Sequence, residues 1–252
     1  MRLSSAFLDY PRWIENGGNF SAEVLEVLTY SMHKDAGGAK SLGEGRLRPS
    51  LIGDPCDRKQ LLSYNFSNSG GSTFKGNWMT WVGTFLHLAF QTYLLDVYPD
   101  KVRIEHTVKP HKGMAGVTGK ADWYWYQKSD NGMMVDINGP HLGDYKSMGK
   151  LSGKEFDVEK APKQAHVDQL MAEMYTMNIN RGYLVYQTRG FGQMAVWELV
   201  AEPADFLPIE ERLNRLTRHA EDGTLPDILL PCQSWQGPYK TCNWAEICMA
   251  HA

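Results

Sequence analysis

The chain has 252 residues, with 42% hydrophobic residues, 22% charged residues and a formal net charge of −3. This composition is typical of a globular protein of one large or two small domains, and no apolar run approaches the roughly 18 residues of a membrane span. The slightly negative charge excludes a general attraction to nucleic acid, so a DNA-binding function would need a local basic patch.

Helical periodicity dominates the first hundred residues. Apolar side chains recur at helical spacing in residues 21–34 and in a long stretch at 76–98, and a short helix follows Pro55 and Cys56. Between the short helix after Cys56 and the long helix, residues 65–77 are rich in Gly, Ser and Asn, which predicts a loop. We therefore expect an N-terminal helical segment over residues 1–75.

Alternation of apolar and polar residues takes over after residue 100. It predicts strands at 101–109, 119–127, 132–137 and 141–147, a helix over 161–178, strands at 182–188 and 193–200, and a helix from 204 to about 220. This order indicates an α/β fold, a single domain with a mixed central sheet flanked by helices. We place the core at residues 76–222 and a cysteine-rich tail at 223–252.

Two of these strands carry acids, one of them beside a lysine. Asp122 lies in GKADWYW, and Asp144 lies two residues before Lys146 in GDYKS. Alternate residues of a strand share a face, so Asp144 and Lys146 point to the same side while Tyr145 turns away. The flanking residues are aromatic or apolar, and buried carboxylates are costly unless a metal ion neutralises them. The pattern suits Mg²⁺ or Mn²⁺ that activates water, although an acid–lysine pair is also a common surface salt bridge.

A histidine in the long helix can join these acids. Gly83 and His87 are one helical turn apart in GTFLH, so the sheet can approach the helix at Gly83 while His87 reaches past it. A single helical histidine is usually a satisfied core residue. An imidazole near two acids, however, could complete a manganese site.

A lysine-rich segment starts at Lys146. Residues 146–163 contain five lysines against three acids. The segment is either a solvated loop or a patch that receives phosphate groups beside the acids, and the sequence leaves both interpretations open.

The chain contains four cysteines: Cys56, and Cys232, Cys242 and Cys248 in the tail. Because the first residues lack the continuous apolar core of a secretory signal, we expect an intracellular, cytoplasmic location, where structural disulfides are disfavoured. Metal ligands, inert buried thiols and two disulfides all stay open, with metal ligation favoured.

The order of these motifs resembles that of the PD-(D/E)XK nuclease superfamily. GTFLH, RIEHTV, GKAD, GDYKS and HVDQLMAEMY follow one another as the superfamily's motifs do, and the resemblance runs from Cys56 to Cys248. It is strongest to the RecB-like branch with an iron–sulfur cluster, which includes the AddB nuclease domain and CRISPR-adaptation-associated exonucleases. The resemblance implies a restriction-endonuclease-like domain.

The resemblance also implies roles for the matching residues. His87, Asp122 and Asp144 would bind Mg²⁺ or Mn²⁺, together with the main-chain carbonyl of Tyr145. Lys146 would orient the attacking water or help to deprotonate it, and would stabilise charge on the phosphate.

Two further positions match less completely. Glu105 corresponds to an acid on the strand before the Gly-x-x-Asp segment, with a side chain expected behind the metal ligands. Superfamily members usually carry Gln-x-x-x-Tyr on the next helix, but here Gln169 is followed by Glu173, and the tyrosine is Tyr175. Residues 169 and 175 are about 240° apart around a helix, so we expect Gln169, and not Tyr175, to contact DNA or the metal ligands.

In the iron–sulfur branch, one cysteine precedes the nuclease motifs and three follow them. The resemblance therefore implies that Cys56, Cys232, Cys242 and Cys248 hold a [4Fe–4S] cluster, which needs four thiolates. Zn²⁺ bound by the same cysteines is the alternative, although structural zinc sites usually pair ligands two to four residues apart. Either metal would fasten the tail to the N-terminal segment.

Taken together, the motifs predict a metal-dependent DNA nuclease, an exonuclease that acts on DNA ends or single strands and is stabilised by the cluster. A catalytically silent DNA-binding or assembly subunit of the same fold is the alternative from another functional class. The sequence GMAGVTGKAD lacks the spacing of a P-loop, so any helicase or recombination protein that acts with the nuclease would be a separate chain.

Overall fold

The computed structural model describes residues 47–65, 74–108, 119–126, 140–151, 157–189 and 193–227, together with residues 242, 244, 245 and 248. The helix expected at 21–34, the strand expected at 132–137 and Cys232 lie outside the described residues.

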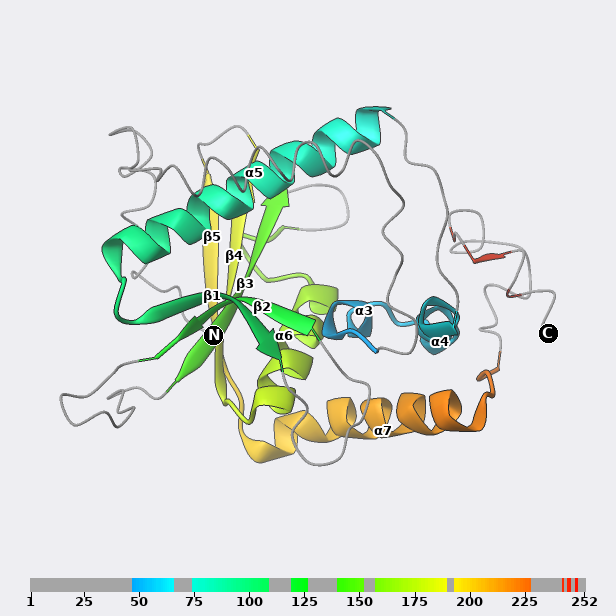
Figure 1. Cartoon of the computed structure of the whole chain (residues 1–252). Coiled ribbons are helices and arrows are strands. Elements are labelled where there is room, and N and C mark those ends of the chain that lie inside the picture. The colour runs from blue at the N-terminus through cyan, green and yellow to red at the C-terminus, as the bar shows by residue number, and fades with distance from the viewer. Residues whose placement is uncertain are drawn as a thin grey trace.

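Five strands form one mixed sheet in the order β1-β2-β3-β4-β5 (Figure 1). Strands β3 and β4 run parallel, and the other neighbouring pairs are antiparallel. A parallel pair needs a long crossover connection, and helix α6 lies in the one between β3 and β4. The strands are β1 (Val102–Val108), β2 (Gly119–Trp125), β3 (His141–Met148), β4 (Arg181–Thr188) and β5 (Met194–Val200).

Helices cover both faces of the sheet (Figure 1). The long helix α5 crosses one face, whereas α6 and α7 lie on the other, and the short helices α3 and α4 lie beside α6 and α7. The expected α/β fold with a mixed sheet flanked by helices is therefore confirmed. The helices are α3 (Pro49–Ile52), α4 (Asp57–Asn65), α5 (Phe74–Val97), α6 (Gln164–Met177) and α7 (Leu207–Asp222), with a 3₁₀ turn η2 at Pro203–Phe206.

A separate hydrophobic core fills each side of the sheet. Under α5 the core is largely aromatic, and the ring of Phe90 contacts those of Trp123 and Tyr145. Under α6 it is largely aliphatic and includes Leu170 and Leu184. Both faces of the central strands are thus largely buried, so a charged side chain on them, such as Asp144, needs a specific partner.

Strands β2 and β3 separate part-way along their length. They pair from Trp125 and His141 as far as Trp123 and Gly143, and beyond Gly143 strand β3 continues only beside β4. A Cβ atom at Gly143 would lie 1.8 Å from the ring of Trp123, so only glycine permits this close approach. The separation leaves Asp122 and Asp144 at the opening between the two strands.

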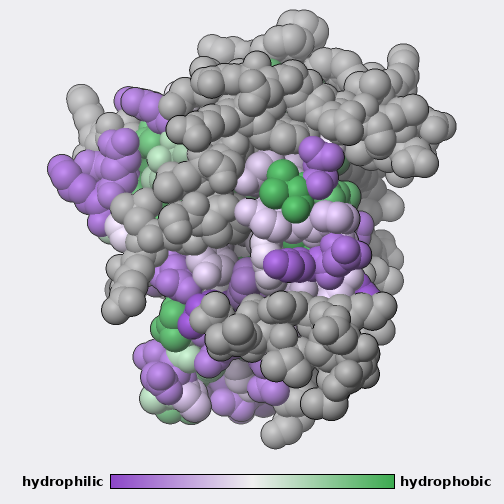
Figure 2. Space-filling view, turned by 90° about the vertical axis from the view of Figure 1, so that its left-hand side faces the viewer, coloured by the Kyte–Doolittle hydropathy of each residue, from purple (hydrophilic) through white to green (hydrophobic). Residues whose placement is uncertain are grey.

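One side of the described surface is mainly polar. Figure 2 shows hydrophilic residues over much of the described part of one side, interrupted by small hydrophobic groups. In the part of the chain that the structure describes, no helix is long and apolar enough to cross a membrane.

Candidate active site

His87 and Asp122 meet between helix α5 and strand β2. The Nε2 atom of His87 lies 3.2 Å from Oδ1 of Asp122, and the imidazole ring stacks on Tyr145. A Cβ atom at Gly83, one turn earlier on α5, would lie 2.7 Å from Oγ of Ser147. The glycine therefore allows β3 to approach α5 closely, as the sequence predicted, and this approach brings His87 to the acids.

The carboxylate of Asp122 takes the place of a backbone acceptor where the pairing of β2 with β3 ends. Its second oxygen, Oδ2, accepts a hydrogen bond of 2.6 Å from the backbone amide of Tyr145. Asp122 and Tyr145 lie just past the last paired residues of β2 and β3. The side chain thus holds the two separating strands at a fixed spacing while its other oxygen faces His87.

Glu105 joins His87 and Asp122 across the β1–β2 pair. One potential ligand atom from each of the three residues lies within 4.8 Å of the others. Glu105 adopts a left-handed backbone conformation with φ of 48°, and it is the one residue of β1 between Val102 and Val108 without a partner in the β1–β2 ladder. Such a conformation is costly for a residue with a Cβ atom, so surrounding contacts must hold it.

Gln91 supplies these contacts. This residue lies one turn after His87 on α5 and is 1% exposed. Its amide nitrogen Nε2 is 2.9 Å from Oε1 of Glu105 and 2.9 Å from the backbone oxygen of Asp122, and 3.0 Å from Nε2 of His87. The two amide hydrogens are therefore used by Glu105 and Asp122, which fixes the orientation of both residues beside the imidazole.

A series of side-chain contacts starts at Asp144, on the side of the sheet that faces α6. The Nζ atom of Lys146 lies 2.7 Å from Oδ2 of Asp144 and donates a 2.9 Å hydrogen bond to Oε1 of Gln169. The amide of Gln169 donates in turn to Oε1 of Glu173 at 3.0 Å. Lys146 is thereby held at a defined position between Asp144 and helix α6.

The charges of His87 and Asp122 stabilise each other. Burial opposes a charge on His87, but Asp122, followed by Glu105 and Asp144, raises the pKa of the imidazole above its usual value. Burial likewise opposes a charge on Asp122, but His87 and the amide of Tyr145 lower the pKa of this carboxyl. Without a metal ion, the two residues form an ion pair.

In contrast to Asp122, Asp144 and Glu173 have raised pKa values. Burial raises the pKa of Asp144 to about 7 against the effect of Lys146, and the charge of Asp122 adds to the rise. Burial, and then the charge of Asp144, raise the pKa of Glu173 well above its usual value. The site therefore contains more buried carboxyl groups than its own cations neutralise.

This surplus of acid fits a divalent metal ion. Oxygen ligands are preferred by Mg²⁺, and Mn²⁺ also accepts an imidazole nitrogen. Opposite ligands of such an ion are about 4 Å apart, close to the span of the His87, Glu105 and Asp122 atoms. These three residues would hold the ion, with Asp144 beside them.

Most of the predicted site residues come together in the structure. His87, Asp122, Asp144 and Lys146 surround the opening between β2 and β3, and Gln169 contacts Lys146. The expected contact of Gln169 with DNA or the metal ligands stays a prediction. Tyr175 lies elsewhere, against Phe206 and near Glu210. Glu105, which we expected behind the metal ligands, has its carboxylate among the candidate ligands.

Sequence reasoning missed two residues of the site. Gln91 follows His87 by four residues on the same helix face, and this spacing was the only sequence signal for its position. Glu173 replaces the tyrosine that superfamily members usually carry, and it is 2% exposed. Its Oε2 atom has no hydrogen-bond partner among the described residues.

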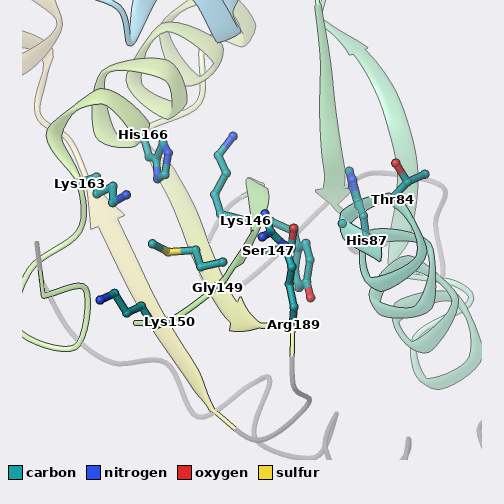
Figure 3. Close-up of a pocket in the computed structure, with 12 residues that line it drawn as sticks. Thr84, His87, Lys146, Ser147, Gly149, Lys150, Lys163, His166 and Arg189 are labelled. Atoms are coloured by element: carbon teal, nitrogen blue, oxygen red, sulfur yellow. The ribbon is translucent and has the colours of Figure 1, made fainter. Parts of the chain in front are cut away.

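A basic cavity of about 750 Å³ adjoins the acids. Figure 3 shows Thr84 and His87 of α5 on one side of it, Lys163 and His166 at the start of α6 on the other, and Lys146 of β3 between them. The described residues that line it are Gly83, Thr84, His87, Tyr145, Lys146, Ser147, Met148, Gly149, Lys150, Lys163, His166 and Arg189.

Three of the four cysteines lie among the described residues, and no disulfide joins any two of these three. Arg58 of α4 donates from Nε to Sγ of Cys248 at 3.1 Å and from Nη2 to the backbone oxygen of Cys248 at 3.1 Å. The backbone amide of Lys59 donates to Sγ of Cys56 at 3.4 Å, and both Cys56 and Cys242 act electrostatically on Lys59. The start of α4 therefore lies beside Cys242 and Cys248.

No family model matches the chain, and no curated protein matches its sequence. The crystal structure of SSO0001 is similar to this chain, with a TM-score of 0.52 and 17% identity over 92% of this chain and 98% of that chain. An alkaline exonuclease from Laribacter hongkongensis, LHK-Exo, has a TM-score of 0.46 and 14% identity over 71% of this chain and 89% of its own. Its complex with dAMP has a TM-score of 0.49 and 13% identity, with the same coverage. The likeness to SSO0001 shows a shared fold.

Proposed function

We propose that the protein is a metal-dependent DNA nuclease that hydrolyses phosphodiester bonds, and that it acts as an exonuclease on DNA ends or single strands. The observation that carries the proposal is the convergence of His87, Glu105 and Asp122 beside the Asp144–Lys146 pair, where β2 and β3 separate. The resemblance of the motifs to PD-(D/E)XK nucleases supports the same chemistry.

Each side chain has a role that follows from its contacts. Mg²⁺ or Mn²⁺ held by His87, Glu105 and Asp122 would polarise the phosphate and lower the pKa of a bound water. Lys146 places its ammonium group beside Asp144, where it can orient that water and stabilise negative charge on the phosphate. Gln169 limits the movement of Lys146, which preserves the geometry that catalysis requires.

The same proposal includes a [4Fe–4S] cluster bound by Cys56, Cys232, Cys242 and Cys248. The N–H donors that Arg58 and Lys59 direct at two of these sulfurs support the proposal, because hydrogen bonds to the ligating sulfurs are a usual feature of iron–sulfur sites. The role would be structural, since the described thiols lie at α4 and the tail, whereas the acids lie in the sheet. An intracellular location would keep these thiols reduced.

Replacement of Lys146 by methionine tests the proposed chemistry. The variant Lys146→Met keeps the length of the side chain but removes the charge that faces Asp144, so Mn²⁺-dependent degradation of labelled DNA should fall at least about 100-fold. Lys160→Met is the matched control, because Lys160 is 84% exposed and pairs with Asp157 at 3.1 Å outside the site. Degradation by Lys146→Met at the rate of this control would refute the proposal and favour a catalytically silent DNA-binding subunit.

A further inference from the structure

The basic cavity collects positive charge from separate parts of the chain. Lys146 lies on β3 and Lys150 follows that strand. Lys163 precedes α6, and Arg189 follows β4. Among the described lining residues there is no carboxylate, although the candidate metal ligands are close by. A concave surface of one charge sign attracts and concentrates ions of the opposite charge.

His166 contributes a neutral hydrogen-bond donor to the same cavity. The hydroxyl of Tyr186 accepts a hydrogen bond from the backbone amide of Lys163 and lies 3.0 Å from Nδ1 of His166. We assign the Tyr186 hydroxyl as the donor and Nδ1 as the acceptor of this hydrogen bond. In the neutral imidazole the other ring nitrogen, Nε2, then carries the proton and can donate. Burial, and then the charges of Lys146 and Lys163, lower the pKa of His166 to about 4, consistent with this neutral form.

We propose that the basic cavity is a second phosphate-binding site, which holds a phosphate group of the nucleic-acid strand next to the bond that is cut. Lys150, Lys163 and Arg189 would neutralise its charge. The inference rests on the proposed function, because Lys146 and His87 belong both to the cavity wall and to the acidic centre. The volume of about 750 Å³ is sufficient for a nucleotide together with its phosphate.

Binding of single-stranded DNA in EDTA tests this site without any catalysis. We would measure the fluorescence anisotropy of a labelled oligonucleotide over a range of salt concentrations, with Lys150→Gln, Lys163→Gln and Arg189→Gln. Each variant should bind at least about 5-fold more weakly, and the slope of log K against log salt should fall by about 0.7 for each lost phosphate contact. Lys101→Gln is the control, since Lys101 is exposed beyond the end of α5.

Oligonucleotides with different ends distinguish the two sources of the phosphate. If the cavity binds a terminal phosphate, the wild-type protein will prefer a 5′- or 3′-phosphorylated oligonucleotide over one with hydroxyl ends, and the variants will lose this preference. If it binds an internal phosphodiester, the variants will weaken binding to linear and circular DNA equally. Either result supports a phosphate site.

Unchanged affinity and salt slope in the cavity variants, relative to Lys101→Gln, would overturn the inference. Lys150 is exposed, so Lys150→Gln leaves the core intact and keeps the test valid even if Arg189→Gln unfolds. Because the assay contains no metal ion, its outcome is independent of the degradation assay with Lys146→Met. Failure of one proposal can therefore be told from failure of the other.

Discussion

Gln91 shows how one buried amide can organise the side chains of the candidate site. Its nitrogen binds both Glu105 and the backbone oxygen of Asp122, while its own oxygen has no hydrogen-bond partner among the described residues. The reverse orientation would place the amide oxygen against two other oxygens, which is worse than leaving it unpaired. The amide therefore has one acceptable orientation, and Glu105 is held in its left-handed conformation.

Replacement of Gln91 by methionine should weaken metal binding. Methionine fills a similar volume but cannot donate to Glu105 or Asp122, so the dissociation constant for Mn²⁺ should rise about 10- to 100-fold in a calorimetric titration. Activity should recover in part at high Mn²⁺, which a purely structural defect would not produce. Gln164→Met, on the exposed side of α6, serves as the control. An unchanged Mn²⁺ affinity would show that Gln91 only fills space.

Asp144 makes the stability of the metal-free protein depend on pH. Its pKa is raised to about 7, chiefly by burial, so the folded protein keeps a proton that the unfolded chain loses near pH 4. The contribution of this group to the free energy of unfolding is complete below about pH 4, and it is lost as the pH rises from there through 7. Asp144→Asn cannot ionise and escapes this loss.

Urea unfolding in EDTA measures this contribution. Between pH 5 and pH 8 the stability of Asp144→Asn should rise relative to the wild-type protein by about 2–3 kcal/mol. Asp168→Asn, which changes a half-buried carboxylate on α6 that accepts an exposed hydrogen bond from Gln164, should show no such trend. A difference between Asp144→Asn and wild type that is the same at both pH values would contradict the account.

Among individual residues, the sequence predicted those that match a recognisable spacing. Asp144 and Lys146 follow from strand alternation, and His87 follows from its position one turn after Gly83. Glu105 was placed less well, because its left-handed backbone turns the side chain in a way that regular strand geometry does not predict. Gln91 was missed because a buried glutamine has no distinctive pattern.

Between elements, the separation of β2 from β3 produces the opening that contains the site. The close approach at Gly143 holds the strands together at one end, and Asp122 holds them apart at the other. Trp123 is fully buried against Phe90, so its ring has little freedom to move away from Gly143. The geometry of the opening therefore depends on a residue with no side chain.

An alanine at position 143 should test this dependence. Its Cβ atom would meet three atoms of the Trp123 ring at 1.8 to 2.5 Å, so Gly143→Ala should lose about 3 kcal/mol of stability. Gly149→Ala, at the end of the same strand, has nothing within 4 Å and should change stability by less than about 0.5 kcal/mol. Chemical denaturation compares the two, and equal effects would show that the close approach is not required.

The positions of the elements were predicted more reliably than their ends. The helix expected at 161–178 begins at Gln164, after Pro162 and Lys163, because a residue before proline avoids the helical conformation. It ends at Met177, where Asn178 adopts a left-handed conformation with φ of 55°. The parallel pairing of β3 with β4 could not be derived from local patterns, since it depends on the crossover through α6.

Across the whole molecule, arginines link segments that are far apart in sequence. Arg58 of α4 binds Cys248 and the backbone oxygen of Pro226, while Arg212 of α7 binds Asp57 at 2.7 Å and the backbone oxygen of Ile52 at 2.6 Å. These contacts join the residues around Cys56 to α7 and the tail. The expected fastening by a metal at the cysteines and the division into segments at 75 and 222 stay predictions.

Colour and metal content test whether the cysteines bind the proposed [4Fe–4S] cluster or a zinc ion. We expect anaerobically purified protein to be brown, to absorb at roughly 400 nm and to contain about four irons per chain. Cys56→Ser should lose the iron and unfold at a lower temperature, whereas Lys146→Met should keep the iron. A colourless protein with one zinc per chain would replace the cluster by a structural zinc site.

The acidic centre is proposed to cleave DNA with the help of a divalent metal ion. We would digest 5′- and 3′-labelled DNA with the wild-type protein and with Asp122→Asn, first in Mn²⁺ and then in EDTA. We expect the wild-type protein to release labelled products only with Mn²⁺, and Asp122→Asn to be slower by at least about 100-fold, because the variant loses a carboxylate oxygen that faces His87. Degradation that persists in EDTA, or equal rates for the two proteins, would contradict the claim.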